Sequence, residues 1–306
     1  MFRLKMSVVL VIIFVTTLAF SKKIQFQDSW GSQGFSLDET KSISSVSITH
    51  SMNEFSMENS LINNEMLTTI QLKGVFLQND EGAPNLPGSS RYIAIPQGAS
   101  AKYTITDLKK EIYQNVDLAP APKIPFDSVD SPMEYKENPE IYSKDAFYPT
   151  SPVILSKPSK IRGVDVVMLG ITPFQYNPVT KELIVYRDIK VDVNFVGGNG
   201  HFGEDRLRNK EWDRILKNTI INNTVLKDVT YKKTSDSKSD DFEYIIICPD
   251  DAIFISYANQ LKEFRTKQGI RTGVVTITQI GGNTEAAIEA YVNNAYNNWD
   301  IPPSAV

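Results

Sequence analysis

The sequence predicts an all-β domain, an antiparallel sandwich or open barrel, followed by the incomplete start of an α/β domain with a parallel sheet. Two observations lead to this prediction. Short apolar runs separated by proline and glycine breakers fill the chain up to about residue 195, as is typical of sandwiches and barrels. From Tyr244 onward the pattern becomes strand, helix, strand, helix, which indicates crossovers on a parallel sheet.

Residues 1–21 have the layout of a secretory signal peptide. Arg3 and Lys5 form a positive start, an almost wholly apolar run of about 15 residues follows, and small residues precede a predicted cleavage between Ser21 and Lys22. The alternative is a membrane anchor, but a span needs about 20 apolar residues. We therefore expect export by this signal, and no membrane span once it is removed.

Residues 22–225 are predicted to form the β domain. Its clearest strand is 189–195, where apolar residues alternate with Lys190, Asp192 and Asn194. A period of two buries one face of a strand and leaves the other in water. Further strand-like runs lie at 67–77, 91–96, 101–113 and 164–171.

Two breaker-rich stretches shape the connections of this domain. Asn177-Pro178 predicts the turn of a hairpin, because proline presets a turn φ and asparagine can bond the backbone ahead of it. Residues 119–158 are rich in proline, which donates no ladder hydrogen bond. We expect this stretch to be an extended loop wrapping the domain and not a central strand.

A short helix and a linker are predicted to follow. Residues 205–222 are polar with apolar residues at helical spacing, whereas 226–241 are charged and serine-rich and cannot bury enough surface to order themselves. Proteases cut such segments. Four basic residues expected to be exposed are candidate processing sites, although plain solvation is the favoured explanation for them: Arg206, Arg208, Lys232 and Lys233.

Residues 242–306 are predicted to start the α/β domain. Residues 244–248 form a near-continuous apolar run, typical of a strand covered on both faces. Asp250-Asp251 would cap the helix that follows, and Thr284 the next one. In the first helix a buried apolar stripe is expected at Phe254, Tyr257, Leu261 and Phe264, and in the second at Ile288, Tyr291, Ala295 and Trp299. The chain ends at 301–306, where a third parallel strand is expected.

The chemistry-bearing residues of this sequence are few. Cys248 is the only cysteine; it is either a nucleophile or, as we expect, a small buried residue at the end of a core strand. Asp250-Asp251 could hold a metal, but helix capping accounts for the pair. No catalytic residue, metal or cofactor is therefore predicted. The net charge of −4 comes from scattered residues, so nucleic acid is not an expected partner.

Three stretches resemble one family. Residues 82–98 (GAPNLPGSSRYIAIPQG) and 161–195 are similar to the propeptide domain of gingipain-type cysteine peptidases, family C25. Residues 243–277 (EYIIICPDDAIFISYANQLKEFRTKQGIRTGVVTI) resemble the opening of the caspase-like α/β catalytic domain of that family. The order of signal peptide, β propeptide and α/β start along one chain agrees with the resemblance.

The resemblance implies the N-terminal part of a secreted or cell-surface bacterial cysteine endopeptidase, made as a zymogen. Its propeptide would assist folding and mask the active site, with its own or a related peptidase domain as partner and protein substrates bound by the full-length enzyme. The catalytic Cys–His pair would lie downstream of Val306, and Cys248 does not match the position of the nucleophile. Two alternatives remain: a free-standing propeptide-like inhibitor or folding partner, and a protein similar to the sortase of type IX secretion.

Overall fold

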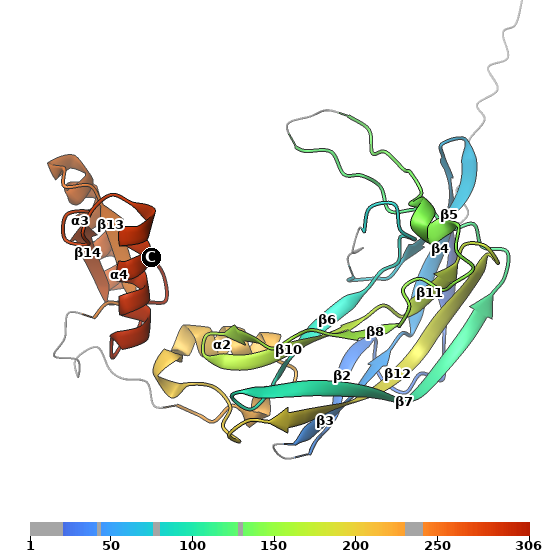
Figure 1. The fold of residues 1–306 in the computed structure, drawn as a ribbon, viewed down its shortest axis with the longest axis horizontal. Coiled ribbons are helices and arrows are strands. Elements are labelled where there is room, and N and C mark those ends of the chain that lie inside the picture. The colour runs from blue at the N-terminus through green and yellow to red at the C-terminus, as the bar shows by residue number, and fades with distance from the viewer. Residues whose placement is uncertain (1–20, 42–43, 76–79, 128–130, 230–240) are drawn as a thin grey trace, which may run out of the picture.

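The computed structural model describes residues 21–41, 44–75, 80–127, 131–229 and 241–306. Residues 21–229 are called the β domain below, and residues 241–306 the α/β unit (Figure 1). Within these ranges no helix is long and apolar enough to cross a membrane.

The described residues of the β domain form three antiparallel sheets. In the central sheet, β12 (Glu182–Gly197) pairs along one edge with β7 (Ala99–Tyr113). Along its other edge it pairs with β11 (Phe174–Asn177) and β3 (Ser45–Ser51), and β3 pairs in turn with β2 (Gly34–Lys41). The second is ordered β6–β10–β8, with β9 beside β10: Ser89–Ala94, Val164–Ile171, Val153–Leu155 and, for β9, Ser159–Ile161. The third is ordered β1–β4–β5: Ser21–Gln25, Glu54–Ile62 and Glu65–Gln71.

The central and second sheets enclose the main hydrophobic core. Ile189, Val191 and Val193 of β12 are completely buried, and they belong to one cluster with Val167 and Leu169 of β10. The alternation predicted for 189–195 is therefore confirmed, and the two facing sheets make this part of the domain a sandwich.

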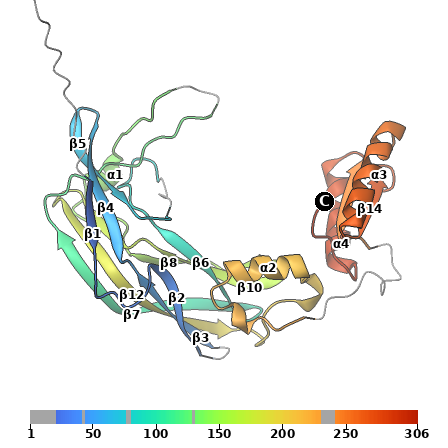
Figure 2. The same cartoon turned by 180° about the vertical axis from the view of Figure 1, so that it is seen from behind.

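A second core fills the space between the third sheet and the other end of β12. Phe55 of β4 meets Phe174 of β11 edge to face, with ring centroids 5.4 Å apart. Leu183 and Val185 of β12 belong to the same buried cluster. Because β12 contributes to both cores, it ties the three sheets together (Figure 2).

The predicted strands were found with errors of a few residues at their ends. The runs 101–113 and 164–171 correspond to β7 and β10, whereas 91–96 is shifted to Ser89–Ala94 and 67–77 to Glu65–Gln71. The predicted hairpin is the β11–β12 pair. The Asn177 side chain accepts hydrogen bonds from the N–H groups of Val179 and Thr180, as the turn chemistry predicted.

The prediction of one extended loop over residues 119–158 was wrong in part. Helix α1 covers Pro139–Tyr142, and β8 covers Val153–Leu155 beside β10. Pro152 comes directly before β8, so no proline interrupts the strand and its N–H groups are available to pair.

A helical layer covers the outer face of the second sheet. It consists of the 3-10 turn Asp205–Leu207, helix α2 (Lys210–Thr219) and the 3-10 turn Asn223–Val225, so the predicted short helix is confirmed. Buried Asn222 donates to the Ala94 carbonyl (2.9 Å) and accepts from the Ala94 N–H (2.8 Å). This side-chain amide thus pairs with β6 much as a neighbouring strand would.

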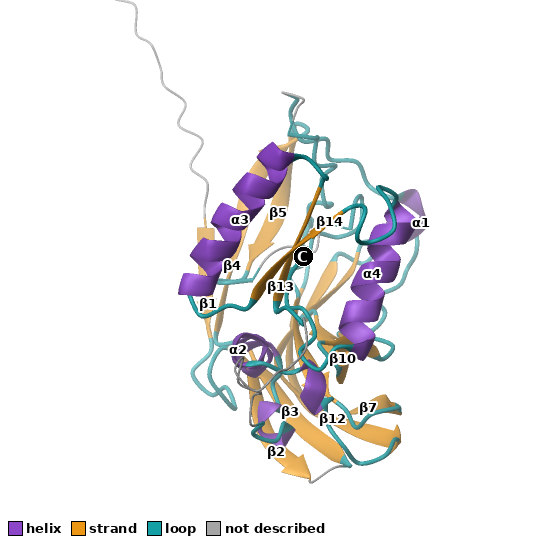
Figure 3. Cartoon of the chain, turned by 90° about the vertical axis from the view of Figure 1, so that its left-hand side faces the viewer, coloured by secondary structure: helices purple, strands orange, loops and turns teal. Residues whose placement is uncertain are grey.

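The α/β unit has the predicted order of elements. Strands β13 (Tyr244–Cys248) and β14 (Thr272–Thr276) pair in parallel, and α3 (Ala252–Lys267) and α4 (Glu285–Asn298) flank them (Figure 3). Asp251 caps α3 and Thr284 caps α4, as predicted. Ala305 forms an isolated parallel bridge with Tyr244 of β13, in the region where a third strand was expected.

The buried stripe predicted for α3 was wrong. Phe254, Tyr257 and Phe264 are more than half exposed, and Ala258 is the buried residue of this helix. The helix carries apolar residues on two faces, and only the face with Ala258 meets the two-stranded sheet. Of the stripe predicted for α4, Ala295 is buried and the other three residues are half-buried.

Candidate functional site

The β domain carries a projecting arm, residues 121–138, within the proline-rich stretch. Figure 1 shows its two legs leaving the third sheet together on the side where the α/β unit lies, and Figure 2 shows the same from behind. Residues 128–130 lie outside the described ranges.

The base of the arm is fixed by backbone hydrogen bonds to Gly82 and Ala83. Gly82 donates to the Ala121 carbonyl (2.9 Å) and accepts from the Asn138 N–H (2.8 Å), while Ala121 donates to Ala83 (2.7 Å). Gly82 has φ +77°, and a Cβ there would lie 2.9 Å from the Lys136 carbonyl oxygen. Glycine is favoured here because it tolerates both the left-handed backbone and the close approach.

The outer part of the arm presents apolar side chains to solvent. Lys123 donates to the Glu134 carbonyl (2.8 Å) and so pairs the legs once more. Beyond this point Ile124 is 62% exposed and Phe126 is 84% exposed. Exposed apolar side chains gathered on one projection mark a contact surface. Ile124 and Phe126 therefore form an exposed apolar surface on the described part of the arm.

The candidate processing site Arg208 is not exposed, so that expectation was wrong. Its guanidinium makes a two-pronged ion pair with Asp213 (both 2.8 Å) and donates to the Lys227 carbonyl (2.6 Å). Both side chains of the pair are buried. The pair ties α2 to the turn that precedes it and to the segment that follows it.

Arg206 is also engaged rather than free in solvent. It donates to the carbonyls of Tyr296 (3.0 Å) and Trp299 (2.9 Å) in the α/β unit. Lys232 and Lys233 lie outside the described residues. Cleavage after any of these four residues stays a prediction, as does signal cleavage between Ser21 and Lys22, the first residues of β1.

Cys248 is a buried free thiol at the end of β13, as expected of a structural cysteine. The histidines lie on elements of the β domain: His50 is buried on β3 against the Phe35 ring, and His201 follows β12. Asp250 accepts hydrogen bonds from the Thr278 N–H (3.0 Å) and hydroxyl (2.7 Å). Hydrogen bonds from Thr276 and Thr278 lower the pKa of this carboxyl.

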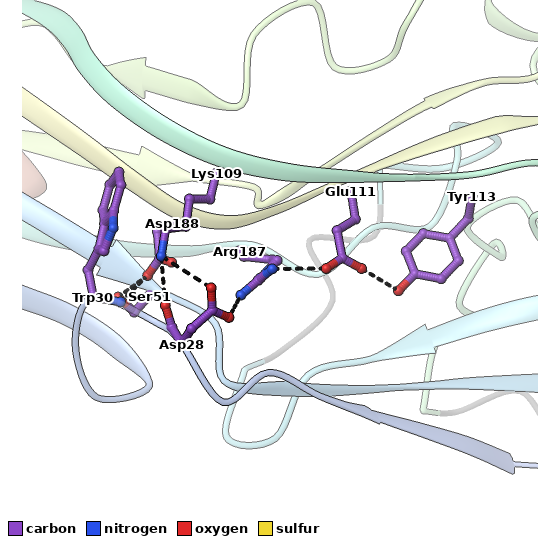
Figure 4. Close-up of polar contacts among 8 residues, drawn as sticks. All are labelled: Asp28, Trp30, Ser51, Lys109, Glu111, Tyr113, Arg187 and Asp188. Atoms are coloured by element: carbon purple, nitrogen blue, oxygen red, sulfur yellow. Dashed lines mark hydrogen bonds and ion pairs between the residues drawn. The ribbon is translucent and has the colours of Figure 1, made fainter.

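A chain of charged residues crosses the central sheet (Figure 4). Arg187 of β12 binds Glu111 (3.0 Å) on one side and Asp28 on the other. Tyr113 donates to Glu111 (3.2 Å), and burial followed by the Glu111 charge raises the pKa of Tyr113 to about 12. Completely buried Asp188 accepts from the Ser51 hydroxyl (2.6 Å).

The same chain fixes the segment after β1. The Trp30 N–H donates to Asp188 (2.9 Å), and Lys109 donates to the Asp28 carbonyl (2.7 Å) while lying over the Trp30 ring. The register of β12 against β7 shifts between Tyr186 and Asp188. This bulge takes Arg187 out of the regular ladder, whereas Asp188 still pairs with Lys109 of β7 and Ser51 of β3. These hydrogen bonds and ion pairs have a structural role, since they anchor residues 28–30 to the β domain.

The sequence did not reveal the exposed Ile124 and Phe126 of the arm or the chain of charged residues. Ile124 and Phe126 lie in a stretch interpreted only as loop, and their exposure depends on three-dimensional packing. Arg187 and Asp188 break the alternation of β12, which was an available signal for a bulge. Arg162 was also missed, although the Arg162-Gly163 pair between two strands was an available signal for a tight turn.

Both units of the chain match families of known proteins. Residues 35–229 match the family Propeptide_C25, and residues 237–306 match Peptidase family C25. The first match covers well over half of the chain, and the protein therefore belongs to the C25 propeptide family. The resemblance predicted from the sequence is confirmed.

The chain is similar to gingipains of Porphyromonas gingivalis. Gingipain R2 is 25% identical over 233 residues, 71% of this chain and 29% of its own length. Lys-gingipain is 22% identical over 236 residues, 75% of this chain and 13% of its own. The solved complex of the RgpB pro- and mature domains matches with a TM-score of 0.55 at 22% identity, over 62% of this chain and 97% of that one. The present chain thus spans less than a third of the length of these curated relatives.

Proposed function

We propose that this chain is the pro-region and peptidase opening of an exported gingipain-like cysteine endopeptidase zymogen. The single observation that carries the proposal is the order of the two family matches, propeptide at 35–229 and then peptidase at 237–306. A propeptide joined directly to a peptidase fold is expected to act on that peptidase. The catalytic Cys–His pair would come from parts of the parent protein outside these residues.

The arm is the part of the β domain that we assign to masking the active site. It projects on the side of the α/β unit, and its base is held by backbone hydrogen bonds. Such pre-ordering lowers the entropy lost on binding. Ile124 and Phe126 supply the apolar surface that a cleft would bury.

Inhibition by the purified chain tests this assignment. Residues 22–306 should inhibit the peptidase released from the parent zymogen, and Phe126→Ser should raise the inhibition constant by about 10-fold or more, as expected for an aromatic anchor. Val179→Ser is the matched control, because Val179 is an exposed apolar residue at the β11–β12 turn. Equal inhibition by both variants would reject the arm as the masking element.

The export part of the proposal has its own test. The signal peptide layout supports secretion from, or display on, a bacterial cell. N-terminal sequencing of the exported protein should begin at Lys22. A protein that keeps Met1 outside the cell would contradict the signal peptide.

A further inference from the structure

The β domain and the α/β unit meet through arginine side chains on one side and backbone carbonyls on the other. Arg162 donates to the carbonyls of Pro303 (2.7 Å) and Pro302 (3.1 Å). Arg206 donates to those of Tyr296 and Trp299, as described above. Guanidinium groups form the stronger, charge-assisted class of hydrogen bond.

The acceptors are groups that need a donor from outside. The last carbonyls of a helix have no partner within it, and the helix dipole places partial negative charge there. Tyr296 lies in the final turn of α4 and Trp299 directly follows the helix. This last turn contains no basic residue of its own. Arg206 therefore supplies from the β domain the cation that the end of α4 lacks.

Arg162 is held in position before it binds. It forms the two-residue turn between β9 and β10 with Gly163, and both residues have positive φ, 46° and 78°. Turns of this kind match the twist of the strands that they join. The guanidinium donates to the Leu207 carbonyl (2.6 Å) and lies over the Trp212 and Tyr296 rings.

The bound segment, residues 302–304, leads directly to the residue that bridges β13. Pro302 and Pro303 are buried, and Asn209 donates to the Ser304 hydroxyl (2.5 Å). The next residue, Ala305, accepts from the Ile245 N–H of β13 (3.0 Å). Contacts to residues 296–304 therefore fix the point at which Ala305 bridges β13.

We propose that Arg162 and Arg206 form a guanidinium clamp through which the β domain binds the end of α4 and the 302–304 segment without help from the covalent link. The partner is the opening of the peptidase domain, so the inference deepens the proposed function and rests on it. The clamp keeps the two units together after the chain between them is cut, and it holds Ala305 beside β13.

Cutting the folded chain tests the clamp. A recognition site for a sequence-specific protease is inserted between Lys233 and Thr234 of the 22–306 chain. After cleavage the two parts should elute together in size-exclusion chromatography. In Arg162→Ala/Arg206→Ala the dissociation constant from a dilution series should rise by about 100-fold or more, as expected for losing several charged hydrogen bonds.

The matched control removes two positive charges from the neighbouring helix. Arg214 and Lys217 are exposed residues of α2 whose ion pairs lie within the β domain. Arg214→Ala/Lys217→Ala should leave the two parts together. Separation of the parts in the unsubstituted chain overturns the clamp, and so does co-elution in the clamp variant or separation in the control.

A second variant guards against misfolding. Among the described residues of the β domain, Glu204 is the one that Arg206 binds. Arg206→Ala should therefore leave the melting of the β domain unchanged and raise the dissociation constant by about 10-fold. An unchanged constant overturns the clamp. The readout is chromatographic and needs no peptidase, so it can fail while inhibition by the arm stands, and the reverse also holds.

Discussion

The β domain and the α/β unit bury their apolar residues to very different extents. In β12 the apolar set at Ile189, Val191 and Val193 is completely buried between two sheets. In α3 the apolar stripe that includes Phe254 and Tyr257 is more than half exposed. The pattern in a sequence shows which residues can share a face, but burial requires a second layer on that face. Among the described residues, the β domain provides that layer and the α/β unit does not.

A pair of phenylalanine substitutions tests most directly whether the two units differ in burial. Phe174→Ala leaves a cavity beside Phe55 and should lower the free energy of unfolding of the β domain by about 3–5 kcal/mol. Phe254→Ala removes an exposed ring and should change stability by no more than about 0.5 kcal/mol. Urea unfolding followed by near-UV circular dichroism measures both. Comparable losses would show that the α3 stripe is covered in solution.

Buried and exposed ion pairs give a second test, this time within the β domain. Asp213→Ala leaves the Arg208 guanidinium buried without its carboxylate partner and should cost about 3–5 kcal/mol. Glu211→Ala removes an exposed pair to Arg214, and such pairs contribute about 0–1 kcal/mol. Thermal melts of the two variants should therefore separate clearly. A small effect of Asp213→Ala would mean that the Arg208 site admits water.

Features that depend on local sequence could be predicted, whereas the burial of individual side chains could not. Local signals were sufficient for β10, β12, the Asn177 turn and the caps at Asp251 and Thr284, because each depends on a few neighbouring residues. Exposure could not be predicted in this way: Arg208 and the α3 stripe were both misjudged, in opposite directions. Whether a side chain is covered depends on elements far away in sequence.

The pH dependence of stability tests the burial of His50 in the β domain. Burial, only partly offset by the Asp188 charge, lowers the pKa of His50 to about 4. The unfolded chain therefore takes up the proton first, so stability present above pH 6.5 is lost as the pH falls toward 4. The loss attributable to His50 is about 3 kcal/mol.

Substitution of His50 isolates this contribution from that of the carboxyl groups. His50→Leu keeps an apolar side chain against Phe35 and should flatten the stability profile between pH 6.5 and 4, measured by urea unfolding. His201→Ala is the control, since His201 is exposed and should leave the profile unchanged. An equal slope in His50→Leu and the unsubstituted chain would show that His50 is not the group responsible.

The smallest expected effect concerns the stability of helix α4 in the α/β unit, which has little buried core. Only Ala295 of α4 is buried, so local devices should carry a larger share of the stability of this helix. The Thr284 hydroxyl accepts from the Ala287 N–H (3.2 Å), and Thr284→Ala should cost about 1 kcal/mol. Hydrogen exchange at Ala287 should then speed up about 5-fold. Thr284→Ser keeps the acceptor and should retain the protection. If both variants exchange alike, the end of α4 is held by packing, and the contrast with the β domain is weaker than the exposed α3 stripe indicates.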